Sequence, residues 1–138
     1  MRRLILLVAA TLLVVAAPAV AASFSFPSVS TNIGAKPKIG RAHGPAPKTL
    51  KTKDIVVGKG AVAKNGSVVS MQYVGKLYKS GKQFDASWDR GAQPFQFQLG
   101  GGQVIPGFDQ GIKGMRVGGR RVLIIPPRLG YGASGSPP

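Results

Sequence analysis

The sequence predicts an α+β domain in which antiparallel strands pack around one short helix. Apolar and polar residues alternate around Val69 and Met71, and again around Phe95, Phe97 and Leu99, as half-buried strands require. A single later segment instead spaces its apolar residues three and four positions apart, which is the helical period. Because the helix lies between strands in the chain, it is expected to pack against the sheet.

Five short strands are expected, and turns separate most of them. An Asn65-Gly66 pair, typical of tight hairpin turns, separates the first two strands, and Ser80-Gly81 separates the second from the third. The expected strands cover residues 54–57, 69–73, 83–85, 95–99 and 120–125.

The helical segment carries Ile105, Phe108, Ile112 and Met115 on one face. Pro106 suits its first turn, where no backbone N–H is needed for the helical hydrogen bonds. Three glycines make the segment intrinsically poor as a helix. The helix is therefore expected to depend on its contacts with the sheet.

The first 22 residues are typical of a signal peptide. Arg2 and Arg3 precede an apolar run over residues 4–17, and Ala19-Val20-Ala21 supplies the small-x-small pattern of a cleavage site. The chain is therefore expected to be exported to the periplasm, cell envelope or exterior, and to meet the membrane only transiently. The alternative is an uncleaved anchor, because the apolar stretch is just long enough to cross about 30 Å of hydrocarbon.

Residues 23–51 are rich in Pro, Ser, Gly and Lys and show no sustained periodicity, which favours a basic tether. Residues 52–138 then form the expected folded domain. The domain is short, so we expect a small core.

The composition excludes most familiar enzyme chemistry. The 138 residues include 19 Lys and Arg, four Asp, no Glu, one His and no Cys, with a formal charge of +15. Neither a thiolate nucleophile nor a zinc cluster can be assembled, so no metal and no cofactor are expected. The charge raises the possibility of nucleic-acid binding, but no recognition motif is present, and we expect only nonspecific attraction to anionic surfaces.

Five motifs in order resemble the FKBP-type peptidyl-prolyl cis–trans isomerase family. The resemblance covers residues 52–138 and implies a twisted antiparallel β-sheet wrapped around one short α-helix, with a pocket between them. The motifs are Tyr73-Val74-Gly75-Lys76-Leu77 with residues 81–87, then residues 94–100, 103–108, 111–119 and 125–132.

The resemblance also implies the residues of a proline-binding pocket. It assigns catalytic roles to Tyr73, Phe84, Asp85, Ile105 and Tyr131, and substrate contacts to Arg90, Phe95, Val104 and Phe108. Arg90 corresponds to the arginine that organises the Tyr73–Asp85 group, and Phe108 stands where the family usually has Trp. The aromatic residue types agree with this reading, since a proline ring needs a concave apolar slot with few polar anchors.

The implied activity is rotation about X–Pro bonds in folding or exported proteins, with proline-containing polypeptides as substrates and macrolides as possible ligands. The alternative is a non-catalytic chaperone module that binds proline peptides. The family pattern continues past the Tyr131 loop with a final strand inside the sheet, so the resemblance further implies that this strand is missing from residues 52–138. The isolated 138-residue chain is therefore expected to fold poorly.

Overall fold

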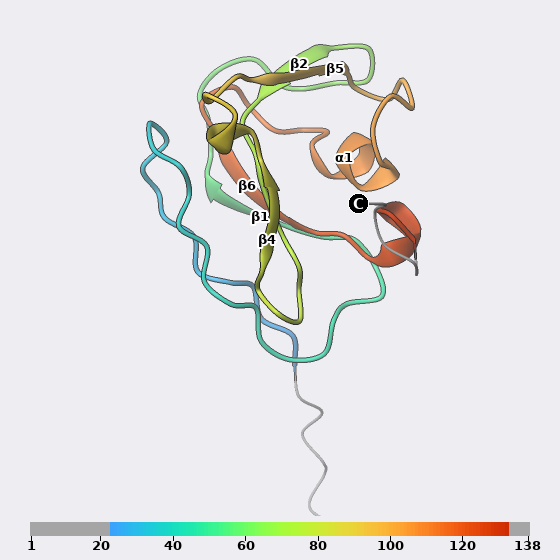
Figure 1. Ribbon diagram of the computed structural model, residues 1–138. Helices are drawn as coiled ribbons and strands as arrows, with labels where there is room; N and C mark the ends of the chain where they lie inside the picture. Colours follow the sequence, from blue (N-terminus) through green and yellow to red (C-terminus); the bar gives the residue numbers. More distant parts are fainter. Residues whose placement is uncertain (1–22, 133–138) are drawn as a thin grey trace, which may run out of the picture.

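The computed structural model describes residues 23–132 and has the α+β class expected from the sequence. Antiparallel strand pairs and the single helix α1 surround a small core (Figure 1). The elements are β1 (Lys51–Val56), β2 (Val68–Met71), β3 (Val74–Lys76), β4 (Gln83–Ala86), η1 (Ser87–Asp89), β5 (Phe95–Gln98), α1 (Pro106–Gly111), β6 (Arg120–Ile124) and η2 (Pro127–Leu129).

The expected strand over residues 69–73 is interrupted and becomes two, β2 and β3. β2 pairs with β5, whereas β3 pairs with β4, both antiparallel. At the break, the Tyr73 N–H donates to the Ser87 hydroxyl at 2.9 Å, and the Ser87 N–H donates to the Tyr73 carbonyl at 3.1 Å. Because Ser87 belongs to η1, these bonds attach η1 to the break between β2 and β3, where Tyr73 lies.

Within residues 23–132 the strands form three two-stranded sheets, β1–β6, β2–β5 and β3–β4, rather than one continuous sheet. The second edges of β6 and β2 have no strand partner in this part of the chain. Both strands line one large groove of about 1680 Å³, which also reaches the candidate site. The single twisted sheet implied by the family resemblance is therefore interrupted between β6 and β2.

The helix α1 is shorter than its apolar spacing suggests. It ends at Gly111, Ile112 is its C-cap, and Met115 lies beyond it. The Arg121 side chain of β6 caps the end of the helix by donating to the carbonyls of Gly111 at 2.9 Å and Lys113 at 3.0 Å. Helix ends need such partners, because their last carbonyls have no donor within the helix.

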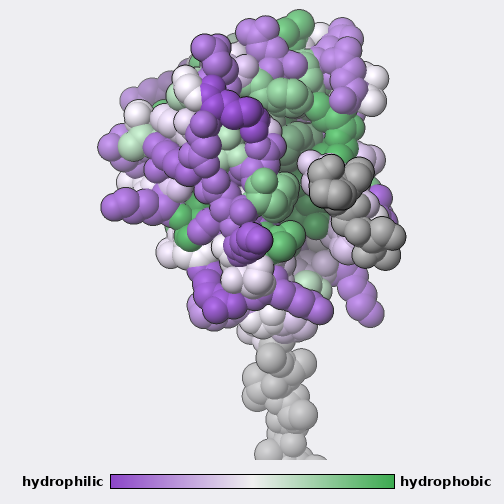
Figure 2. All heavy atoms as spheres, in the orientation of Figure 1, coloured by the Kyte–Doolittle hydropathy of each residue, from purple (hydrophilic) through white to green (hydrophobic). Residues whose placement is uncertain are grey.

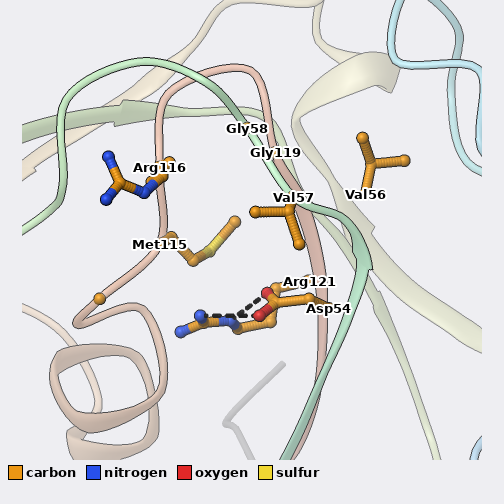
Figure 3. A pocket seen from close by; sticks show the side chains of 9 residues that line it. Asp54, Val56, Val57, Gly58, Met115, Arg116, Gly119 and Arg121 are labelled. Carbon is orange, nitrogen blue, oxygen red and sulfur yellow. Dashed lines mark hydrogen bonds and ion pairs between the residues drawn. The ribbon is translucent and has the colours of Figure 1, made fainter.

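Arg121 also forms an ion pair with Asp54 of β1, its guanidinium nitrogens lying 2.7 and 3.2 Å from the two carboxylate oxygens (Figure 3). The pair borders a cavity of only about 50 Å³, between β1 and the loop that follows α1. This cavity is far too small for a peptide, so the pair has a structural role: it joins β1, β6 and the end of α1.

Two glycines allow α1 to approach the sheet closely. A Cβ atom at Gly107 would lie 2.5 Å from Ile125 Cγ2, and one at Gly111 would lie 2.8 Å from Leu123 Cδ2. The glycines that weaken the helix intrinsically are thus required by its packing. The core beneath consists of Phe97, Leu99 and Ile112, as expected for the inward positions of the Phe97–Leu99 stretch, and Leu99 is only 1% exposed.

The segment expected to be a tether folds back on the domain from residue 23 to β1 (Figure 1). It has no regular helix or strand, but Arg120 of β6 donates to the carbonyls of Ser30 at 2.6 Å and Ala35 at 2.8 Å. Lys36 forms an ion pair with Asp89 at 2.6 Å. Composition suggested the irregular backbone but not these contacts, which join residues far apart in the sequence.

The predicted signal peptide lies outside the described residues, as do residues 133–138. Between residues 23 and 132, no helix has the length and apolar character needed to cross a membrane.

Candidate functional site

Three polar side chains from two neighbouring segments form a closed group. The Tyr73 hydroxyl donates to Asp85 Oδ2 at 2.5 Å, and Arg90 Nη2 donates to the Tyr73 hydroxyl oxygen at 2.8 Å. Arg90 also forms an ion pair with Asp85 through Oδ1. Asp85 lies on β4 and Arg90 directly follows η1, so the β3–β4 pairing and the short η1 turn place all three together.

This group shifts the protonation equilibria of its members. The hydrogen bond from Tyr73 lowers the pKa of the Asp85 carboxyl, and the nearby Arg90 lowers it further. Burial raises the pKa of the Tyr73 phenol, and its bond to Asp85 acts in the same direction. Asp85 is thus an anion and Tyr73 a neutral phenol at neutral pH, so neither is poised to transfer a proton there.

Aromatic rings form the apolar wall beside the polar group. The Tyr73 ring packs edge-on against Phe95 at 5.9 Å and against Phe108 at 6.0 Å, measured between centroids. The Phe84 ring meets the Tyr131 ring at 6.2 Å and 90°. The structure therefore brings together the five aromatic residues that the resemblance assigned to the pocket, and all five border the same large groove. Asp85 and Arg90 of the polar group do not line this groove.

Phe84 and Tyr131 are unusual for large rings because each is 49% exposed. Gly75 of β3 makes the position of Phe84 possible, since a Cβ at Gly75 would lie 2.7 Å from the ring atom Cζ of Phe84. Neither ring belongs to the buried core around Leu99. Their exposed faces are accordingly available to an apolar ligand.

Val104 and Ile105 border the groove just before α1. Ile105 is the N-cap of the helix, in an extended conformation, and its carbonyl accepts the hydrogen bond of Phe108 at 2.9 Å. Among the described residues, the Ile105 N–H donates to no backbone carbonyl. This donor is therefore available to a carbonyl placed in the groove.

Two residues that contribute to the site were not identified from the sequence. Trp88, the one tryptophan of the chain, lies in η1 and lines the groove. Ser87 is 1% exposed, and its hydroxyl donates to the Gln72 side chain at 2.6 Å. A buried serine has no sequence signature, and a tryptophan beside a polar run gave no indication of which surface it would line.

The site combines an apolar slot, two candidate donors and a polar group whose charges are already paired. No cluster of three metal-ligating side chains occurs within residues 23–132. The arrangement suits binding of an apolar ring with carbonyls on either side.

The protein is a small α+β domain with an aromatic pocket beside α1, and comparison identifies its family. The sequence profile described as "FKBP-type peptidyl-prolyl cis-trans isomerase" matches residues 59–138. The chain belongs to this family, and its enzyme class is peptidyl-prolyl cis–trans isomerase.

Individual relatives agree with this assignment. An FK506-binding protein from Streptomyces anulatus is 54% identical over 101 residues, which are 73% of this chain and 81% of that protein. The crystal structure of AtFKBP13 is similar with a TM-score of 0.59 and 45% identity, over 66% of this chain and 76% of that one. FKBP12 from Mycobacterium tuberculosis gives a TM-score of 0.50 with 52% identity, covering 67% of this chain and 71% of that one.

Proposed function

We propose that this domain accelerates X–Pro bond rotation by binding the proline ring in the slot between Phe84, Phe95, Phe108 and Tyr131. The observation that carries the proposal is the half-exposed Phe84–Tyr131 pair beside the Tyr73–Asp85–Arg90 group. This arrangement offers an apolar surface without an acid or base that titrates near neutrality.

The proposed mechanism is desolvation. Amide resonance keeps the peptide bond planar and gives a rotation barrier of about 18–20 kcal/mol. The planar form is the more polar one, so water stabilises it more than it stabilises the twisted transition state. An apolar slot removes part of that stabilisation and lowers the barrier without proton transfer.

Two donors are proposed to hold the chain while the bond turns. The Ile105 N–H donates to no backbone carbonyl of the described residues, and Ile105 and Tyr131 both border the groove. Each can bind a carbonyl next to the proline. Holding the flanking peptide fixed matters because rotation needs one side of the bond to stay in place.

Phe108 bears on ligand choice. The Streptomyces anulatus relative is named for binding FK506, and we propose that the same slot accepts macrolides of that kind. Phe108 keeps an aromatic floor against Tyr73 but has no N–H donor. Macrolide affinity is therefore expected to be weaker than in a domain with Trp at this position, while isomerase activity is retained.

A protease-coupled assay on a series of X–Pro peptides tests the proposal. We expect acceleration without added metal or nucleotide. A folded protein that binds these peptides yet leaves the rotation rate unchanged would instead establish the non-catalytic chaperone module. An inhibitory macrolide that blocks the reaction in proportion to its binding would connect the activity to this slot.

We also propose that residues 1–22 direct export. The support is the sequence alone: the paired arginines, the apolar run and Ala19-Val20-Ala21. Intact-mass analysis of the exported protein should find a first residue near Ala22 or Ser23. Recovery of chains that begin at Met1 from the membrane fraction would show an uncleaved anchor.

A final proposal concerns the interrupted sheet. We propose that an additional antiparallel strand pairs between β6 and β2, as the family resemblance implies. The supporting observation is that these two strands line one groove and have unpaired edges within the described residues. Unpaired edges of this kind otherwise invite association with other chains.

A further inference from the structure

The four aspartates of this strongly basic chain are all engaged. Three form ion pairs with a cation, and the fourth accepts hydrogen bonds from backbone N–H groups. The pairs are Asp54–Arg121, Asp85–Arg90 and Asp89–Lys36, and Asp109 binds Gly100 and Gly102. Every other described Lys and Arg therefore lacks an ion-pair partner within residues 23–132.

Five of these cations gather where the β3–β4 hairpin meets the N-terminal segment. Arg41 Nη2 donates to the Lys79 carbonyl at 2.8 Å, and Lys76 Nζ donates to the Ile39 carbonyl at 2.9 Å. All five side chains are exposed. We call this surface the cationic face, and it consists of Lys38, Arg41, Lys76, Lys79 and Lys82.

The described chain begins beside this face. The Tyr78 hydroxyl at the hairpin tip lies 3.2 Å from the His43 carbonyl and 3.1 Å from the Gly44 carbonyl. A Cβ atom at Gly44 would in turn lie 2.5 Å from the Ser23 carbonyl. The hairpin tip and residue 23 are accordingly at the same end of the molecule (Figure 1), where Figure 2 shows strongly hydrophilic residues.

We propose that the cationic face docks the domain on a membrane surface that carries anionic phospholipid. Residue 23 follows the segment that contains the apolar run 4–17, so this face lies next to the point where that run joins the domain. Until the proposed cleavage near Ala22, a bilayer that holds the apolar run would face these five cations with its headgroups, so the docking proposed here is that of the uncleaved chain. Near an anionic surface each cation contributes about a fivefold gain in partitioning.

This orientation has a functional consequence. β4 runs from the hairpin tip towards η1 (Figure 1). Lys82 directly precedes β4 and Arg90 directly follows η1, so the two residues lie at opposite ends of this stretch. Docking through the tip leaves the polar group around Arg90 free, whereas Arg41, Lys76 and Lys79 border the large groove at the docked end. A membrane-docked domain would thus present its pocket to polypeptides that emerge from the same membrane.

Nucleic acid is the competing anionic partner. Proteins that hold single strands add exposed aromatic side chains for base stacking to their basic surface. The aromatic residue at this face, Tyr78, is half-buried and its hydroxyl is already bonded to backbone carbonyls. The face therefore offers phosphate contacts without a stacking platform, which favours a lipid surface.

Flotation of the full chain with vesicles tests the proposal. One variant replaces the five cations of the face with Gln, and a control replaces five exposed cations elsewhere, which gives the same net charge. Neutral phosphatidylcholine vesicles measure the contribution of the apolar segment, and vesicles with about 30 mol% phosphatidylglycerol measure the electrostatic increment. The control positions are Lys59, Lys64, Lys113, Arg116 and Arg128.

We expect the face variant to lose at least about tenfold of the phosphatidylglycerol increment and the control to lose less than about threefold. About 0.5 M salt should abolish the increment for the unsubstituted chain. If both variants lost the same part of the phosphatidylglycerol increment, vesicle binding would depend on net charge alone and the proposal would be wrong. Selective loss of binding to DNA, with vesicle binding intact, would assign the face to nucleic acid instead. Circular dichroism should be unchanged in the face variant, which excludes misfolding as the cause of its lost vesicle binding. The X–Pro assay should also be unchanged, so a failure of the docking proposal can be told apart from a failure of the proposed function.

Discussion

The Tyr73 hydroxyl donates a hydrogen bond to the Asp85 carboxylate across 2.5 Å, and Arg90 contacts both groups. Asp85→Asn removes the charge that Arg90 pairs with and weakens the bond to Tyr73. We expect kcat/KM to fall by about three- to tenfold, less than a fully buried charged hydrogen bond would give, because the pair is partly exposed. Asp54→Asn, in the remote pair with Arg121, is the matched control and should leave kcat/KM unchanged.

The same group predicts how stability depends on pH. The folded-state pKa of Asp85 is lowered, chiefly by the bond from Tyr73, so its contribution is present above the unfolded pKa and is lost as pH falls through the folded value. The folded-state pKa of Tyr73 is raised, chiefly by burial, so its contribution is lost only as pH rises above about 10. Melting temperatures should decline below about pH 4, and less steeply in Asp85→Asn.

Activity should respond differently from stability. Neither Asp85 nor Tyr73 changes its protonation state near neutrality, so the isomerisation rate should be nearly flat between about pH 6 and 9. Progress curves for one peptide across this range provide the measurement. A bell-shaped profile centred near pH 7 would contradict desolvation and require an acid or base that we have not identified.

Variants of Phe84 and Tyr131 distinguish the contribution of the apolar slot from that of the proposed hydroxyl donor. Phe84→Ala removes a half-exposed ring from the apolar wall, and we expect at least about a tenfold loss of kcat/KM with little change in stability. Tyr131→Phe removes one hydroxyl and should weaken peptide and macrolide binding by about three- to tenfold. Calorimetric titration and the coupled assay measure these effects. Wild-type values for both variants would show that the ligand binds elsewhere.

Gly107 tests the close approach of α1 to the sheet. A methyl group there would meet Ile125 Cγ2 at 2.5 Å, so Gly107→Ala should destabilise the domain by about 1–3 kcal/mol despite its better helix propensity. Gln110→Ala, at an exposed position of the same helix, is the control and should be neutral or slightly stabilising. Denaturant unfolding compares the two. Stabilisation by Gly107→Ala would mean that helix propensity outweighs this packing.

Alternation and turn residues predicted strands near β1, β2, β4, β5 and β6 and the Phe97–Leu99 core, because these follow from local patterns, but they did not predict β3 or the break before it. The end of α1 was misjudged: the apolar spacing continues to Met115, but Arg121, distant in sequence, provides the cap after Gly111. The contacts of residues 23–50 depend on single side chains such as Arg120, which composition cannot show. The pocket residues came from the family resemblance, because nothing local distinguishes a half-exposed Phe84 from a core phenylalanine.

The interrupted sheet gives the last prediction. A segment of about 15–20 residues added after Pro138, with one alternating apolar strand, should pair between β6 and β2 and cover part of their groove. Burial of even three apolar side chains is worth about 1.5–3 kcal/mol each, so the melting temperature should rise by at least about 10 °C. A segment of the same composition with two prolines inside the strand cannot complete the pairing and is the control. Amide exchange supplies the decisive measurement: protection of the β6 N–H groups should increase only with the alternating segment. Equal protection with both segments would show that the edges of β6 and β2 do not accept a strand.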